Sequence, residues 1–125
     1  MKIILFLAPA IGLLTAFGPI AASEPSAHPG SDLFTRACGT CHTAVKGGEH
    51  RQGPNLWNIF GAKSAAQSGF AYSAALAAAG LTWSEENLER WLEDSAEMIP
   101  GSVMAYAQRN PDRRSLIIDF LKTLK

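Results

Sequence analysis

The sequence has little that could bind nucleic acid or build a disulfide framework. Its 11 basic and 11 acidic residues balance, so no excess of positive charge indicates a nucleic-acid partner. It has only two cysteines, which leaves no further pair to staple a small domain. No nucleophile–base pair, carboxylate dyad or phosphate-binding loop is recognisable, so nothing indicates an enzyme. With 125 residues, the chain is long enough for one domain.

Charge is also missing from a long N-terminal stretch. Lys2 is followed by residues 3–22, which contain no charged side chain, and small residues close the run at 21–23. This pattern predicts a secretory signal peptide over residues 1–23, removed to leave a domain of residues 24–125 with a formal charge of −1. The alternative is an uncleaved membrane anchor, because the apolar run is nearly long enough to span a bilayer.

What the chain does have is Cys38-Gly39-Thr40-Cys41-His42, with the C-x-x-C-H spacing of a c-type haem attachment site. Two thiols that bond one porphyrin edge must lie one short turn apart, and the imidazole that follows can ligate the iron. The motif predicts one covalently attached haem c. Because haem c is attached outside the bacterial cytoplasm, it also predicts export to the periplasm, or anchoring on the periplasmic side.

The two cysteines allow three other interpretations. A thioredoxin-like pair would follow a strand, and no Val/Ile-rich strand precedes Cys38. A structural zinc site needs four ligands, and only His28 and His50 could join, at irregular spacing. A disulfide between Cys38 and Cys41 is the remaining alternative.

Helical periodicity dominates the rest of the chain, without a convincing strand, and predicts an all-α domain. The first helix should begin between residues 26 and 31 and run to about 41. A short Ala-rich helix is expected over residues 73–79, stopped by Gly80.

Two later helices have clear boundaries in the sequence. One should begin after an N-cap at Thr82 or Ser84 and continue until Pro100 prevents it. The last should begin at Pro111 with Asn110 as its N-cap. Its pattern predicts a buried stripe of Ile117, Phe120, Leu121 and Leu124. The residues predicted to face solvent are Arg113, Arg114, Asp119 and Lys122.

After cleavage, two methionines remain to fill the second axial position of the iron. A thioether is a soft ligand that favours the reduced metal. Met98 lies at the end of a predicted helix, where a core position explains it. Met104 follows Ile99-Pro100-Gly101, an irregular segment able to cross a flat cofactor, so we favour Met104.

Taken together, these motifs make the chain resemble the class I c-type cytochromes of the soluble mitochondrial and bacterial type over essentially all of residues 24–125. The shared pieces are Gly30-x-x-x-Phe34, Cys38–His42, Gly47-Gly48-x-His50, Gly53-Pro54-Asn55-Leu56, Gly69–Tyr72, Gly80–Trp83, Ile99–Met104 and Phe120-Leu121-Lys122. The resemblance implies the small cytochrome c fold, in which several helices wrap around one covalently bound haem.

The resemblance also implies roles for single residues. Cys38 and Cys41 would carry the thioethers, and His42 and Met104 would be the axial ligands. The carbonyl of Pro54 would accept a hydrogen bond from the outer imidazole nitrogen and fix its tautomer.

Other implied roles concern aromatic residues and helix packing. Tyr72 and Trp83 would donate to a buried haem propionate; the alternative is that both are ordinary core aromatics. Gly30 and Phe34 would pack against the final helix.

Several positions depart from the family pattern. Ala62 stands where relatives have an Arg near the propionates, Leu76 where they have a buried Asn, and Trp91 where they have a Tyr beside the Met ligand. Much of the lysine ring of those relatives is absent, and its positions hold Ala37, Ala96, Glu97 and Val103. These changes leave haem attachment and ligation untouched, but they bear on the reduction potential and the partner.

The predicted function is that of a soluble, monomeric, monohaem one-electron carrier. Its partners would be redox proteins, either a membrane oxidoreductase or a soluble enzyme. One alternative is a haem-binding subunit of a larger oxidoreductase complex. Another is a haem peroxidase or gas-binding sensor, which would need an open iron position.

Overall fold

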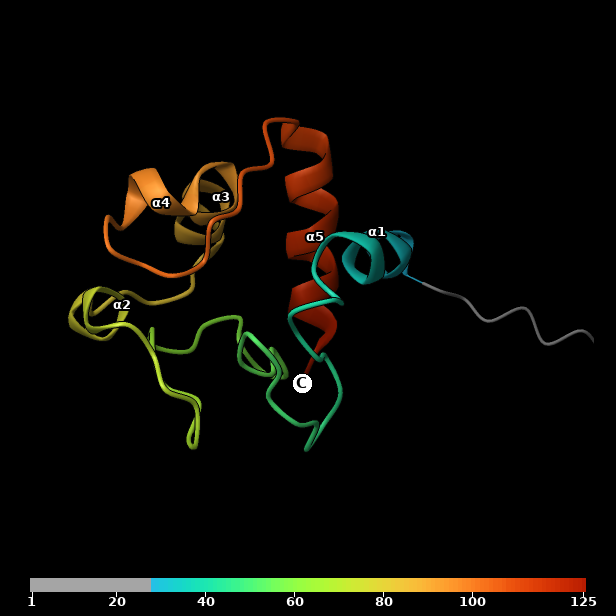
Figure 1. The fold of residues 1–125 in the computed structure, drawn as a ribbon. Coiled ribbons are helices and arrows are strands. Elements are labelled where there is room, and N and C mark those ends of the chain that lie inside the picture. The colour runs from blue at the N-terminus through green and yellow to red at the C-terminus, as the bar shows by residue number, and fades with distance from the viewer. Residues whose placement is uncertain (1–27) are drawn as a thin grey trace, which may run out of the picture.

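The computed structural model describes residues 28–125, and the predicted signal peptide of residues 1–23 lies outside them. The helices are α1 (Pro29–Ala37), α2 (Ala74–Ala78), α3 (Glu85–Glu93), α4 (Ser95–Met98) and α5 (Pro111–Thr123) (Figure 1). Residues 28–125 contain no strand, only an isolated bridge between Lys63 and Thr82, so the all-α prediction is confirmed. None of these five helices is long and apolar enough to cross a membrane.

Helix α1 begins as predicted but ends four residues earlier than predicted. His28 is its N-cap, and the ring Nδ1 accepts a hydrogen bond from the Gly30 amide at 3.1 Å. The helix ends because Cys38 leaves helical geometry and the chain turns back at once. The amides of Cys41 and His42 both donate to the Cys38 carbonyl, at 3.0 and 2.9 Å. The haem motif therefore forms a turn of its own rather than a continuation of α1.

Helix α1 packs across α5, and Figure 1 shows the two crossing near the middle of α5. The contact requires a glycine, because a Cβ on Gly30 would collide with the carbonyl of Leu116 on α5. Beside it the rings of Phe34 and Phe120 meet with centroids 5.1 Å apart. The expected packing of Gly30 and Phe34 against the final helix is confirmed.

The helix predicted to run from Ser84 toward Pro100 is divided at Asp94. Ser84 is its N-cap, with Oγ accepting from the Asn87 amide at 3.2 Å. Asp94 then adopts extended geometry and ends α3, and its carboxylate accepts from the Glu97 amide at 3.0 Å to begin α4. A short Asp side chain competes for backbone amides in this way, which helical periodicity alone does not reveal.

Helix α5 begins at Pro111 with Asn110 as N-cap, as predicted. Ile117, Leu121 and Leu124 are buried, whereas Phe120 is only partly buried.

The prediction that Arg114 faces water is wrong, since the residue is 8% exposed. Helix α3 covers it, and Glu89 on that helix accepts from its Nε at 2.6 Å. A charged side chain can be buried here because it is paired with the half-buried Glu89.

Candidate haem site

A cavity of about 400 Å³ lies between α3, α5, the turn after α1 and the loop before α5. This volume is in the usual range for a cofactor or small-molecule site. All seven residues predicted for the site line it, namely Cys38, Cys41, His42, Pro54, Tyr72, Trp83 and Met104. Met98 is not among the lining residues and packs against the hydrophobic core. The structure thus brings together residues that lie up to 66 positions apart in the sequence.

The orientation of His42 is set by the main chain on both sides of it. Its amide donates to Cys38 O, and its ring Nδ1 lies 2.7 Å from the carbonyl oxygen of Pro54. Because a carbonyl can only accept, Nδ1 must carry the hydrogen, and in the neutral ring Nε2 then has the lone pair. Burial lowers the pKa of His42, and this effect outweighs the opposing hydrogen bond to Pro54. The imidazole is therefore neutral and can act as a metal ligand.

Gly53 brings the following loop against the His42 ring. Its amide donates to Cys41 O at 2.8 Å, so the loop is tied to the haem motif directly before Pro54. A Cβ at this position would collide with the imidazole ring. The glycine is needed for this close approach, which places the Pro54 carbonyl within reach of Nδ1.

The two thiols do not pair with each other, so the structure lacks the disulfide that was the remaining alternative for Cys38 and Cys41. Burial, and secondarily the neighbouring Cys41, raises the pKa of Cys38 to about 11. Before haem is attached, Cys38 is therefore a thiol and not a thiolate.

The two histidines considered for zinc have other roles. His28 caps α1, whereas His50 accepts from the Asn55 amide at 3.0 Å and donates through Nε2 to Ser68 O at 2.9 Å. His50 thus joins two loops beside the haem motif.

Tyr72 and Trp83 lie on the cavity wall, as predicted, but in different surroundings. Trp83 is buried and contacts Trp91 with ring centroids 5.4 Å apart. Tyr72 is partly buried and packs edge-on against Phe70. Burial raises the pKa of Tyr72, against the opposing effect of a hydrogen bond with the backbone of Gln67.

Two residues of the site were missed in the sequence. Ser95 is fully buried and bonded to the loop that carries Met104. Its spacing from Leu88, Trp91 and Leu92 places it on the buried stripe of the helix, where a serine needs a partner. Tyr106 lines the cavity, and its hydroxyl is buried with no hydrogen-bond partner among the described residues.

These groups fit a covalently held haem. The cavity wall offers two thiols, a neutral imidazole with a free Nε2 and a thioether, among largely apolar side chains. The partnerless hydroxyl of Tyr106 indicates that a further group belongs in this space, because a buried polar atom left without a partner is costly.

Comparison with known proteins gives one consistent result. The family model for cytochrome c matches residues 27–125. A cytochrome c of Chlamydomonas reinhardtii is 42% identical over 94 residues, which is 74% of this chain and 84% of the relative. A cytochrome c2 of Rhodopila globiformis is 36% identical over 106 residues, covering 82% of this chain and 99% of the relative. The chain therefore belongs to the cytochrome c family, and it is a monohaem electron carrier with covalently bound haem c, not an enzyme.

Proposed function

We propose that Cys38 and Cys41 hold the haem through two thioethers, and that His42 and Met104 fill the two axial positions. The observation that carries this assignment is that all four residues line one cavity whose imidazole is already oriented by Pro54. The bound haem supplies reversible one-electron transfer. The chain's own residues hold the haem, occupy both faces of the iron and exclude water from the porphyrin.

The choice of Met104 over Met98 rests on position in the fold. Met104 lies on the cavity wall, and Met98 packs in the core at the end of α4. A thioether ligand favours the ferrous state, so this arrangement serves a carrier of raised reduction potential. With both axial positions filled by side chains, no substrate can reach the metal.

Tyr72 and Trp83 are proposed as hydrogen-bond donors to a haem propionate. Support comes from their place on the same cavity wall and from the burial of Trp83, whose indole N–H needs a partner.

Export is proposed on the charge pattern of residues 1–23, which indicates a cleaved signal peptide and a periplasmic location for residues 24–125. The start of the family match at residue 27 agrees with this boundary. As an electron carrier, the protein has redox partners, and a membrane oxidoreductase or a soluble redox enzyme is proposed. Mass spectrometry of exported protein should find the new N-terminus within a few residues of Ser23; retention of Lys2 in a membrane fraction would favour the anchored form.

The test uses protein exported by a host that attaches haem c. Acid extraction should leave the haem on the polypeptide, and the mass should equal the processed chain plus one haem. The ferric protein should show the weak near-infrared sulfur-to-iron band. Met104→Ala should abolish this band and Met98→Ala should keep it; the reverse result, or a freely extractable haem, would overturn the assignment.

A further inference from the structure

The loop that carries Met104, residues 99–108, is here named the methionine segment. It leaves the end of α4 at Ile99 and runs to Gln108, shortly before α5. Within it, the Ser102 amide donates to Ile99 O at 3.0 Å, which is a local turn. Its far end is held where the Gln108 amide donates to Leu92 O at 2.8 Å. Neither bond reaches Met104 itself.

Met104 is held instead from Ser95, the first residue of α4. The Ser95 side chain is 0% exposed. Its Oγ lies 2.5 Å from Met104 O and 3.1 Å from Tyr106 O, and the Tyr106 amide donates to the same Oγ at 3.0 Å. The Ser95 amide in turn donates to Tyr106 O at 3.0 Å. One serine thus contacts the main chain of Met104 and both main-chain groups of Tyr106.

The available hydrogens decide which of these contacts are hydrogen bonds. The Ser95 hydroxyl has one hydrogen and can donate to one acceptor at a time. Tyr106 O already accepts a hydrogen bond from the Ser95 amide. This amide can donate outside α4 because the first amides of a helix have no partner within it. The hydroxyl hydrogen therefore goes to Met104 O, the nearer acceptor. A lone pair of Ser95 Oγ accepts the hydrogen bond from the Tyr106 amide.

Packing from outside contributes little to the position of this segment. Val103, directly before Met104, is 79% exposed. Ala105, directly after it, is exposed as well. Because the residues on either side of Met104 face water, this stretch is tied to the body of the protein by the bonds from Ser95 and by the Met104 and Tyr106 side chains, which pack against the core.

We propose that Ser95 is a positioning residue that sets how often the methionine segment opens and exposes the iron. The proposal rests on the ligation of iron by Met104 proposed above. In the closed form Ser95 holds Met104 on the cavity wall. In the open form the three bonds that join Ser95 to Met104 and Tyr106 are broken, and a small external ligand can replace the thioether.

The opening equilibrium can be measured with imidazole added to the ferric holoprotein. Imidazole binds only the open form, so its apparent Kd is the intrinsic Kd divided by the open fraction. Ser95→Ala removes the donor to Met104 O and the acceptor of the Tyr106 amide, and groups left without partners destabilise the closed form. We expect the apparent Kd for imidazole to fall at least tenfold, which corresponds to 1.4 kcal/mol.

The matched control is Ser84→Ala. Ser84 caps α3 by accepting one hydrogen bond from the Asn87 amide, and it is not hydrogen-bonded to the methionine segment. This change lowers overall stability but should leave the apparent imidazole Kd within twofold of the parent. An unchanged Kd in Ser95→Ala, or an equal fall in both variants, would overturn the proposal.

Hydrogen exchange in the unmodified holoprotein gives an independent test that needs no variant. The Ser95 and Tyr106 amides are each bonded across the same contact, so they should exchange with equal protection. Exchange of Tyr106 more than tenfold faster than that of Ser95 would overturn the proposal. Absence of the near-infrared band in the parent would instead refute the ligation by Met104, and the exchange result would still decide whether Ser95 closes the segment.

Discussion

The two sides of the cavity hold their proposed iron ligands in different ways. On the His42 side, main-chain groups hold the ligand. The amides of Cys41 and His42 donate to Cys38 O, and the Gly53 amide donates to Cys41 O. The Pro54 carbonyl accepts from the imidazole ring. On the Met104 side, two main-chain bonds hold the segment at Tyr106 and Gln108, and side chains from other elements supply the remaining ties.

The Met104 side depends on two such side chains. Ser95 holds Met104 and Tyr106, and the buried Arg114 donates through Nη1 to Gln108 O at 2.8 Å. A main-chain turn next to the two proposed attachment points cannot move far, whereas a loop that depends in part on single side chains can open as a unit. One proposed ligand, His42, therefore lies on a rigid turn, and the other, Met104, lies on a segment with its own local stability.

The largest expected effect is the contrast between removing the two ligands. His42→Ala should prevent recovery of haem-loaded protein, because the ligand of the scaffold is lost. Met104→Ala should still yield a folded haem protein, but its ferrous form should bind carbon monoxide readily, whereas the parent binds it poorly. Absorption spectra with and without carbon monoxide measure both. Equal loss of holoprotein in the two variants would contradict the difference between the two sides.

Next in size is Gly53→Ala, which tests the rigidity of the His42 side. The added Cβ would collide with the imidazole, and overpacking at such a site costs about 1–3 kcal/mol. Denaturant unfolding of the holoprotein measures this loss. Gly47→Ala is the control, since its Cβ would meet no atom within 4 Å and only the strain of its positive φ remains. If Gly53→Ala were no more destabilising than Gly47→Ala, the contact with His42 would not constrain the ring.

Arg114→Ala tests the support of the Met104 side. It removes the bond to Gln108 O and leaves Glu89 without its partner at 2.6 Å, so we expect about 1–3 kcal/mol of lost stability. Lys122→Ala is the control, because the Lys122–Glu85 pair at 3.0 Å is more exposed and should show no measurable change. Equal effects of the two substitutions in denaturant unfolding would show that burial of the Arg114 pair adds nothing.

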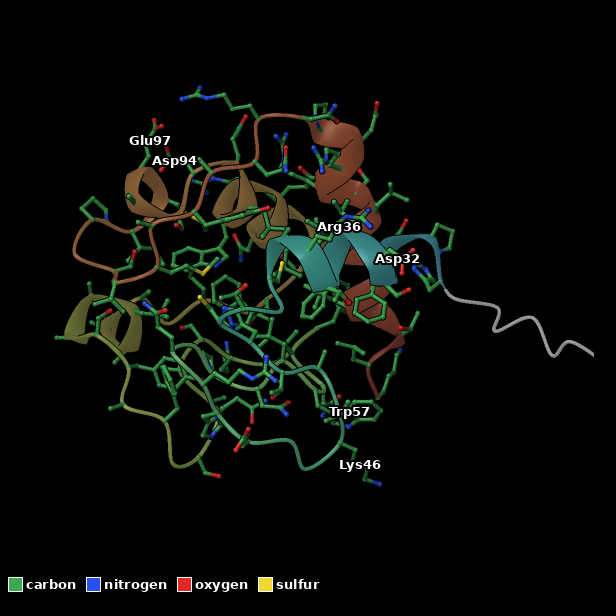
Figure 2. The ribbon with its side chains drawn as sticks, turned by 45° about the vertical axis from the view of Figure 1, so that its right-hand side comes forward. Asp32, Arg36, Lys46, Trp57, Asp94 and Glu97 are labelled. Carbon is green, nitrogen blue, oxygen red and sulfur yellow. The ribbon has the colours of Figure 1, made fainter. Side chains whose placement is uncertain are left out.

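The smallest expected effect is that of salt on electron transfer. Asp94, the N-cap of α4, and Glu97 on that helix lie together, and Figure 2 shows them at the opposite end of the molecule from Lys46. The exposed Val103 gives an apolar contact on the methionine segment. We therefore expect docking to be mainly apolar, so that stopped-flow rates with the native partner vary little with ionic strength.

A steep fall of the rate with salt would contradict apolar docking. Arg51 is the alternative source of charge, since it is exposed and its guanidinium donates to Gly39 O in the turn of the haem motif. Loss of the salt dependence in Arg51→Ala would assign the docking to a basic patch at that turn.

Local chemistry and a shared family pattern were enough to predict the all-α class, the N-cap at Asn110 and the packing of Gly30 against the last helix, and they narrowed the other N-cap to Thr82 or Ser84. They also identified seven of the residues that line the cavity. C-x-x-C-H has few other uses, so the chemistry could be read from five neighbouring residues.

Only the tertiary structure decided how the Met104 side is held. Ser95 and Arg114 have ordinary positions in helical patterns, and their importance depends on partners 11 and 25 residues away in the chain. The division between α3 and α4 likewise follows from the cap that Asp94 forms. Helical periodicity alone does not distinguish an Asp that caps a helix from one that is simply exposed. Hydrogen bonds of buried polar groups are set by which elements pack together, and packing is a property of the whole chain.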